Sequence, residues 1–109
     1  MADSFSYELS LPGAPSDAQA RLKAIVTERL RVAGSMRLAS EDPGALTFRP
    51  RWTFPMLLAV VRMISGETVT LSFAADGGAT RVAVTGKVGS STRKLASQEF
   101  WAELLGSAA

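Results

Sequence analysis

Apolar and polar residues alternate with a period of two in several segments of this 109-residue chain, the pattern of strands buried on one face. The first such segment spans residues 5–11, with four apolar residues on one side and serines and a glutamate on the other. Two predicted hairpins follow. One covers residues 36–52 with its turn at residues 41–44, and the other covers residues 68–88 with its turn at residues 76–78. Pro50 cannot donate a ladder hydrogen bond, so we expect the second strand of the first hairpin to end there or to have a free edge.

Helical spacing of apolar residues appears in two places. Leu22, Val26 and Leu30 belong to a stripe that predicts an amphipathic helix over residues 16–33, with Gly34 as its C-terminal signal. Ser16 and Gln19 have the spacing of a capping box at the start of this helix. A second helix is predicted from about residue 97 to the glycine at 106.

The predicted elements follow the order β-α-β-β-(apolar segment)-β-β-α in one domain, residues 1–109. The natural way to bury these patterns is an α+β fold, with a four- to five-stranded antiparallel sheet and helices on one face. This order resembles the TATA-binding-protein-like (TBP-like) and helix-grip group of folds, in which a curved sheet wraps a long helix. The resemblance is in topology and in no motif, so it implies a fold and no function.

An apolar segment between the two hairpins is the most unusual feature of the chain. The sequence reads WTFPMLLAVVRMISG from Trp52 to Gly66, and only Arg62 interrupts its central apolar run. Thr53, Pro55 and Gly66 suit a helix of about three turns, whereas the neighbouring valines suit a strand. The side chains need a cover, and the candidates are the domain's own core, a second copy in a homodimer, a membrane surface or an apolar ligand.

The candidate interface consists of apolar residues of this segment with arginines at their rim. Its residues are Arg49, Arg51, Trp52, Phe54, Met56, Leu57, Leu58, Val61 and Arg62. The apolar residues would supply desolvation energy and the arginines would set orientation, most simply in a C2 dimer. Basic residues beside a tryptophan also suit attachment at a membrane surface.

The outward face of the predicted sheet forms a second candidate, because it combines hydroxyl side chains with basic ones. Its secondary basic residues are Arg37, Arg81 and Lys87. Such a face can bind phosphate or carboxylate groups, although arginine and threonine also suit a solvated sheet face. The face carries no aromatic residue for base stacking, so a nucleic-acid partner is disfavoured.

Composition narrows the chemistry further. The chain has no Cys and no His, which removes disulfides, the usual zinc, copper and iron ligands and the commonest general base. No carboxylate pair is placed by local spacing into one cleft, so we expect no enzyme activity, no metal and no cofactor. The net charge is +2, and nine of the twelve basic residues are Arg, as in high-GC bacteria.

Location follows from two further features. The N-terminus is acidic and alternating, which favours a cytoplasmic protein, and the apolar run is shorter than the roughly 20 residues that a transmembrane helix needs. Peripheral membrane attachment stays open.

The sequence therefore predicts a small non-enzymatic binding domain that self-associates or docks through residues 52–64. One alternative is a helix-grip cavity for an apolar ligand or lipid, lined by Phe48, Trp52, Phe73 and Trp101. The other is binding of a membrane surface or anionic partner through the basic sheet face.

Overall fold

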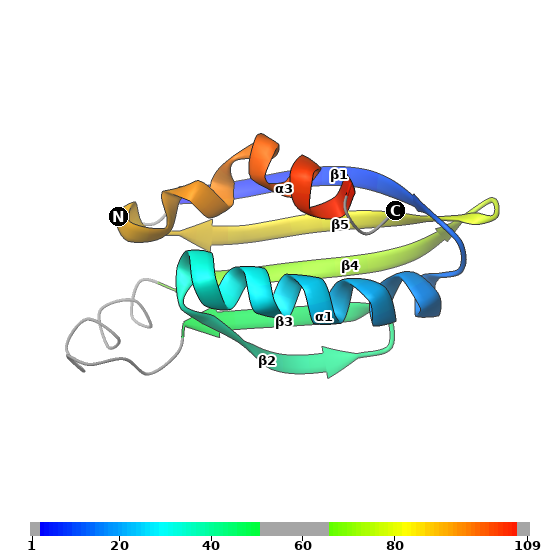
Figure 1. Ribbon diagram of the computed structural model, residues 1–109, viewed down its shortest axis with the longest axis horizontal. Coiled ribbons are helices and arrows are strands. Elements are labelled where there is room, and N and C mark those ends of the chain that lie inside the picture. Colours follow the sequence, from blue (N-terminus) through cyan, green and yellow to red (C-terminus); the bar gives the residue numbers. More distant parts are fainter. Residues whose placement is uncertain (1–2, 51–65, 107–109) are drawn as a thin grey trace.

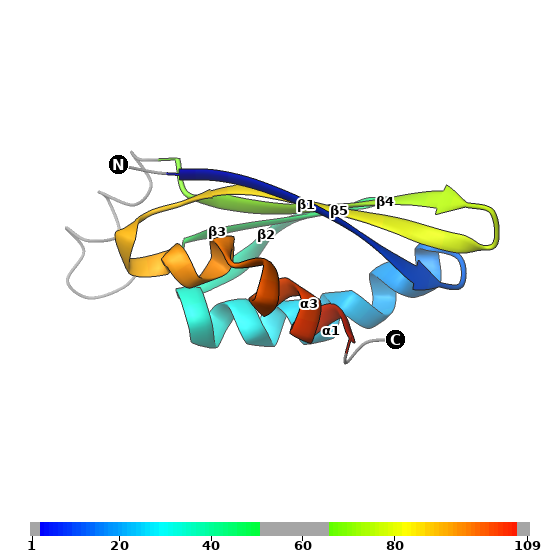
Figure 2. The same cartoon turned by 90° about the horizontal axis from the view of Figure 1, so that it is seen from above.

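The computed structural model describes residues 3–50 and 66–106, which form a five-stranded antiparallel sheet and two α-helices. The elements are β1 (Asp3–Pro12), α1 (Pro15–Gly34), β2 (Met36–Asp42), β3 (Ala45–Pro50), β4 (Thr68–Asp76), β5 (Ala79–Val88), the 3-10 helix η1 (Ser90–Ala96) and α3 (Gln98–Gly106). The strand order across the sheet is β1-β5-β4-β3-β2 (Figure 1). Both α-helices lie against the same face of the sheet, so the expected α+β class with an antiparallel sheet is confirmed (Figure 2).

The long helix α1 forms where the apolar stripe predicts it. Ala18, Leu22, Val26 and Leu30 recur every four residues and are all fully buried, which places one face of the helix on the sheet. Ser35 ends the helix in the left-handed conformation, with φ 50°, and its backbone N–H donates to the carbonyl of Leu30. The observed helix extends one residue beyond the predicted range at each end.

The predicted capping box is wrong. Ala14 occupies the N-cap position of α1, and no side chain caps the helix. Gln19 instead donates from Nε2 to the carbonyl of Asp42 at 2.8 Å and accepts the backbone N–H of Gly44 at 2.8 Å. A tertiary contact has therefore replaced the local one, and it ties α1 to the turn between β2 and β3.

The core lies between the sheet and the two helices. Its members are Leu11, Ala18, Leu22, Val26, Leu30, Met36, Leu46, Phe48, Val69, Leu71, Phe73, Val82, Val84, Val88, Leu95, Trp101, Leu104 and Leu105. Trp101 of α3 is fully buried and donates from Nε1 to the carbonyl of Leu95 at 2.6 Å. Its ring stacks on Phe5 of β1 with centroids 6.4 Å apart, and the Tyr7 hydroxyl donates to the carbonyl of Ala96. These contacts fix η1 and α3 beneath β1.

The strand connections agree with the turn signals, with one irregularity. Gly77 and Gly78 adopt φ of 56° and 86° in the β4–β5 hairpin, which a two-residue turn of this kind requires. The register of β2 against β3 shifts between Leu38 and Ser40, so Ala39 is an extra residue in a bulge that the sequence pattern does not predict. β3 is described as far as Pro50, which lies opposite Met36 of β2 and directly precedes the residues outside the description.

No helix in the described part of the chain is long and apolar enough to span a bilayer.

The contacts of Gln19 lead to a stability prediction. Gln19→Ala removes two hydrogen bonds between α1 and the β2–β3 turn, so we expect the free energy of unfolding to fall by about 1–2 kcal/mol. Ser16→Ala is the matched control and should change it by less than about 0.5 kcal/mol, because Ser16 caps nothing. Urea denaturation measures both values. A larger loss for Ser16→Ala than for Gln19→Ala would contradict the observed contacts.

Candidate binding surface on the open face of the sheet

The face of the sheet opposite the helices is polar and is not covered by any described helix (Figure 2). Its residues alternate with the buried ones along each strand. The polar ones are Ser4, Ser6, Glu8, Ser10, Arg37, Ser40, Asp42, Thr47, Arg49, Thr68, Thr70, Ser72, Asp76, Arg81, Thr85 and Lys87, and Ala45, Ala74 and Ala83 lie among them. None of these described residues is aromatic or large and apolar, so the face offers hydrogen bonds and charge.

A continuous line of hydroxyl groups crosses this face, and we call it the hydroxyl row. The strand register places the five side chains in one line across all strands, in the order Ser6, Thr85, Thr70, Thr47, Ser40. Ser40 belongs to the row only because the bulge at Ala39 shifts the register of β2. Local alternation therefore identifies the other four hydroxyls and misses Ser40.

Three basic side chains gather at one end of the same face, and we call Arg37, Arg49 and Lys87 the cationic row. Arg37 is directly opposite Arg49 in the β2–β3 ladder, and Lys87 is directly opposite Thr68 in the β4–β5 ladder. β3 and β4 pair up to Phe48 and Val69, and Arg49 and Thr68 are the next residues at that end. The row therefore crosses four strands.

The cationic row is not neutralised within the described part of the chain. All three side chains are exposed, and no ion pair joins any of them to a described carboxylate. Arg37 and Arg49 also repel each other, because like charges directly opposite in a ladder are destabilising. Glu67 precedes Thr68 but is only 6% exposed, so it does not belong to the open face.

Three other basic side chains are paired with carboxylates. Lys23 Nζ lies 2.8 Å from Glu41 Oε1, and the hydrogen bond from Arg31 lowers the pKa of Glu28. Arg81, predicted to be part of the basic face, lies 3.4 Å from Glu8 and 3.5 Å from Asp76. Arg81 is thus paired and lies on the far side of the hydroxyl row from Lys87. The structure brings together Arg37, Arg49 and Lys87 and separates Arg81 from them.

The remaining predicted interface residues lie outside the described residues. They are Arg51, Trp52, Phe54, Met56, Leu57, Leu58, Val61 and Arg62.

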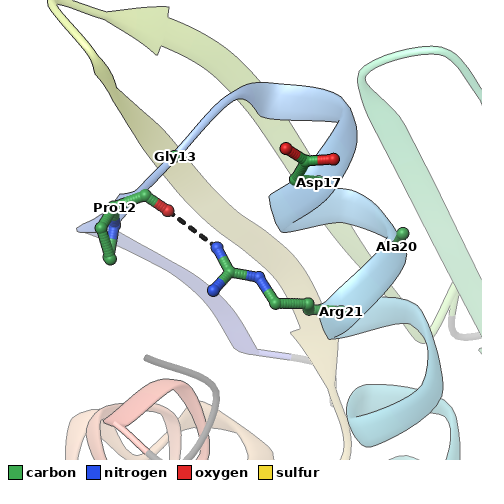
Figure 3. A pocket seen from close by; sticks show the side chains of 5 residues that line it. All are labelled: Pro12, Gly13, Asp17, Ala20 and Arg21. Carbon is green, nitrogen blue, oxygen red and sulfur yellow. Dashed lines mark hydrogen bonds between the residues drawn. The ribbon is translucent and has the colours of Figure 1, made fainter.

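Three of the four aromatic residues assigned to a ligand cavity are in the core, and the fourth, Trp52, lies outside the described residues. Phe48 and Trp101 are fully buried, Phe73 is 7% exposed, and all three contact other core side chains. Three depressions in the described surface are lined by other residues, and the largest, about 600 Å³, lies at the start of α1. There Arg21 Nη2 donates to the carbonyl of Pro12 at 2.7 Å beside Asp17, and the pocket is wide open to solvent (Figure 3). Its polar lining consists of the Asp17 carboxylate and the Arg21 guanidinium in an open depression, which gives no basis for a specific ligand.

Metal coordination has no candidate centre in the described residues. No group of three acidic side chains there is close enough to hold a metal ion, and His and Cys are missing from the sequence. The open sheet face is therefore the best-defined candidate site.

No protein-family model matches the chain, and no curated protein sequence matches it.

Repulsion within the cationic row leads to a second stability prediction. Arg49→Thr removes one member of the Arg37–Arg49 pair and adds a residue that suits strands, so the domain should gain about 0.5 kcal/mol in low salt. The gain should shrink at high ionic strength, because salt screens exposed charges. Arg81→Thr is the control and should give no gain, since it loses two ion pairs. Thermal unfolding at two salt concentrations measures both, and equal shifts would show that the repulsion is negligible.

Proposed function

We propose that this protein is a small non-enzymatic binding domain that docks onto an anionic membrane surface through the cationic end of its sheet. The observation that carries the proposal is the cationic row, in which three exposed cations lie together without a described counter-charge. Two of them face each other at a cost in stability. An external row of phosphate groups would turn this repulsion into attraction, and adjacent hydroxyls would add hydrogen bonds.

The apolar segment supports this choice of partner. Residues 51–65 connect β3 and β4, which are neighbouring antiparallel strands, and a hairpin connection usually needs only two to five residues. The connection leaves β3 just after Arg49 and enters β4 just before Thr68, so the apolar sequence is inserted at the cationic end. Cations with an adjacent apolar run are typical of interfacial attachment, in which lipid headgroups meet the cations and acyl chains meet the apolar residues.

Self-association through residues 52–64 is the alternative to docking on a membrane. The same apolar residues would then be covered by another copy, with Arg49 and Arg62 at the rim of the interface. The strongest support for the membrane surface over this arrangement is charge, because two copies would bring two cationic rows toward one interface.

A location in the cytoplasm with attachment at the membrane surface accompanies the proposal. We also infer that the fold belongs with the TBP-like and helix-grip group. The long helix between β1 and β2, and the position of β1 next to β5, support that relationship. An apolar cavity of the helix-grip kind has less support, since Phe48, Phe73 and Trp101 are packed in the core.

Vesicle binding tests the membrane proposal. Wild-type protein should sediment with vesicles of phosphatidylcholine and phosphatidylglycerol and should bind pure phosphatidylcholine far less. The double variant Arg37→Gln, Arg49→Gln should bind the anionic vesicles on the order of tenfold to thirtyfold more weakly, because each cation near such a surface contributes about 1 kcal/mol. Arg29→Gln with Arg31→Gln is the matched control, since it removes the same charge from α1, and should lose much less.

Two further measurements separate the alternatives. Leu57→Asp should weaken vesicle binding, and unchanged binding would remove the apolar segment from the proposal. Light scattering of the wild type and of Leu58→Glu tests self-association through that segment. If both double variants lose vesicle binding equally, the effect comes from net charge, and the cationic row has no special role.

A further inference from the structure

The two edge strands of the sheet are protected to different degrees. β2 has seven residues and contains the bulge at Ala39, both of which hinder the addition of another strand. β1 has ten residues and pairs with β5 without any register shift, from Asp3 opposite Val88 to Pro12 opposite Ala79. Between these ends β1 contains no lysine, no proline and no bulge. Figure 2 shows β1 along the front of the sheet, with α3 below it.

The register shows which backbone groups of β1 point away from the sheet. Phe73 of β4 donates its backbone N–H to the carbonyl of Gly44, just before β3, so odd-numbered residues of β4 bond toward β3. In an antiparallel ladder, successive residues hydrogen-bond to opposite sides. Carried through the β4–β5 and β1–β5 registers, this rule makes Tyr7 bond to Val84 of β5. The outward-pointing N–H and C=O groups belong to Ser4, Ser6, Glu8 and Ser10.

We propose that β1 is a dimer interface, in which β1 of a second copy pairs with it in antiparallel orientation about a two-fold axis at Tyr7. This arrangement places Ser6 opposite Glu8 of the second copy and Ser4 opposite its Ser10. All four outward-pointing residues then form ladder hydrogen bonds, and each pair occurs twice by symmetry. The proposal does not depend on the membrane function, because β1 carries no member of the cationic row.

The side chains of β1 favour this register over its neighbours. An axis at Glu8 would set the two Glu8 carboxylates opposite each other, which is destabilising. An axis at Ser6 would pair fewer of the described outward-pointing residues, because Ser10 would then face residue 2. With the axis at Tyr7, the inner face pairs Phe5 with Leu9 and Tyr7 with Tyr7, and all these side chains are partly buried and packed against the core.

The space beside β1 also suits another strand. A groove of about 160 Å³ follows this edge, with Leu9 and Leu11 of β1 on one side and Ala102 and Leu105 of α3 on the other. In the proposed register, Phe5 of the second copy stands opposite Leu9, next to this groove. An unrelated extended peptide would satisfy the backbone groups equally well, but in this register β1 sets no like charges directly opposite each other and pairs apolar side chains with apolar ones, which favours a second copy as the occupant.

Hydrogen exchange of the wild type tests the proposal without a substitution. The backbone N–H of Ser6 should exchange more slowly as the protein concentration rises, because the dimer protects it. The N–H of Tyr7 is the internal control, since it bonds to β5 in monomer and dimer alike. Exchange at Ser6 that does not depend on concentration, together with a monomer by sedimentation at about 1 mM, would overturn the proposal.

Substitutions at Ser6 test the register by sedimentation equilibrium. Ser6→Pro removes an outward N–H from each copy and should weaken the dimer on the order of thirtyfold, without loss of a β1–β5 bond. Ser6→Glu faces Glu8 of the second copy and should weaken it roughly tenfold, whereas Ser6→Lys should not weaken it. Circular dichroism of each variant reports whether it is folded. If Ser6→Pro is unfolded, the hydrogen exchange of Ser6 in the wild type remains the test of the dimer.

Leu58→Glu distinguishes this dimer from one formed through residues 52–64. A dimer that survives Leu58→Glu and is lost in Ser6→Glu supports the β1 interface. A dimer that is lost in Leu58→Glu and survives both Ser6→Pro and Ser6→Glu overturns it. Vesicle binding by the Arg37→Gln, Arg49→Gln variant reports on the membrane function separately, so the two proposals fail independently.

Discussion

Burial of one face of a single sheet is the constraint on which the rest of the structure depends. Every strand contributes alternate side chains to a core that α1 and α3 close from the same side. Trp101 is central to this closure, since it is fully buried, stacks on Phe5 and donates a hydrogen bond to Leu95. Because both described helices lie on that side, the opposite face need only remain compatible with water. Its side chains are therefore free to acquire a binding role without loss of packing.

The local pattern of residues predicts the elements well because burial is one-sided. Side chains that contact the core recur at every second residue of β1, β4 and β5 and at every fourth residue of α1, so the sequence pattern shows them directly. The local pattern cannot predict features that depend on contacts with other elements. The bulge at Ala39 is set by pairing with β3, and Gln19 bonds to a turn more than twenty residues away instead of capping its helix. Neither feature can be read from the residues next to it in the sequence.

The candidate site shows the same division. The sequence indicates that Arg37, Arg49, Arg81 and Lys87 point outward, but alternation treats them as equal members of one basic face. Register and ion pairing separate them, since Arg81 is held by Glu8 and Asp76 while the other three lie together and unpaired among the described residues. Such a cluster depends on which strands are neighbours and on how they are aligned, and short-range patterns contain neither. The apolar residues of segment 52–64, in contrast, are evident from the sequence and lie outside the described structure.

The two proposed surfaces reinforce each other through symmetry. Antiparallel pairing within a sheet relates the strands by a two-fold axis perpendicular to the sheet, so both copies would present their open faces on the same side. Lys87 lies opposite Ser4, near one end of β1, and the axis at Tyr7 would carry the equivalent lysine to the opposite end. A dimer would then hold two cationic rows, well separated, toward one anionic surface. Because attachment of one row raises the effective concentration of the other at the same membrane, weak contacts in each copy would combine into firm binding.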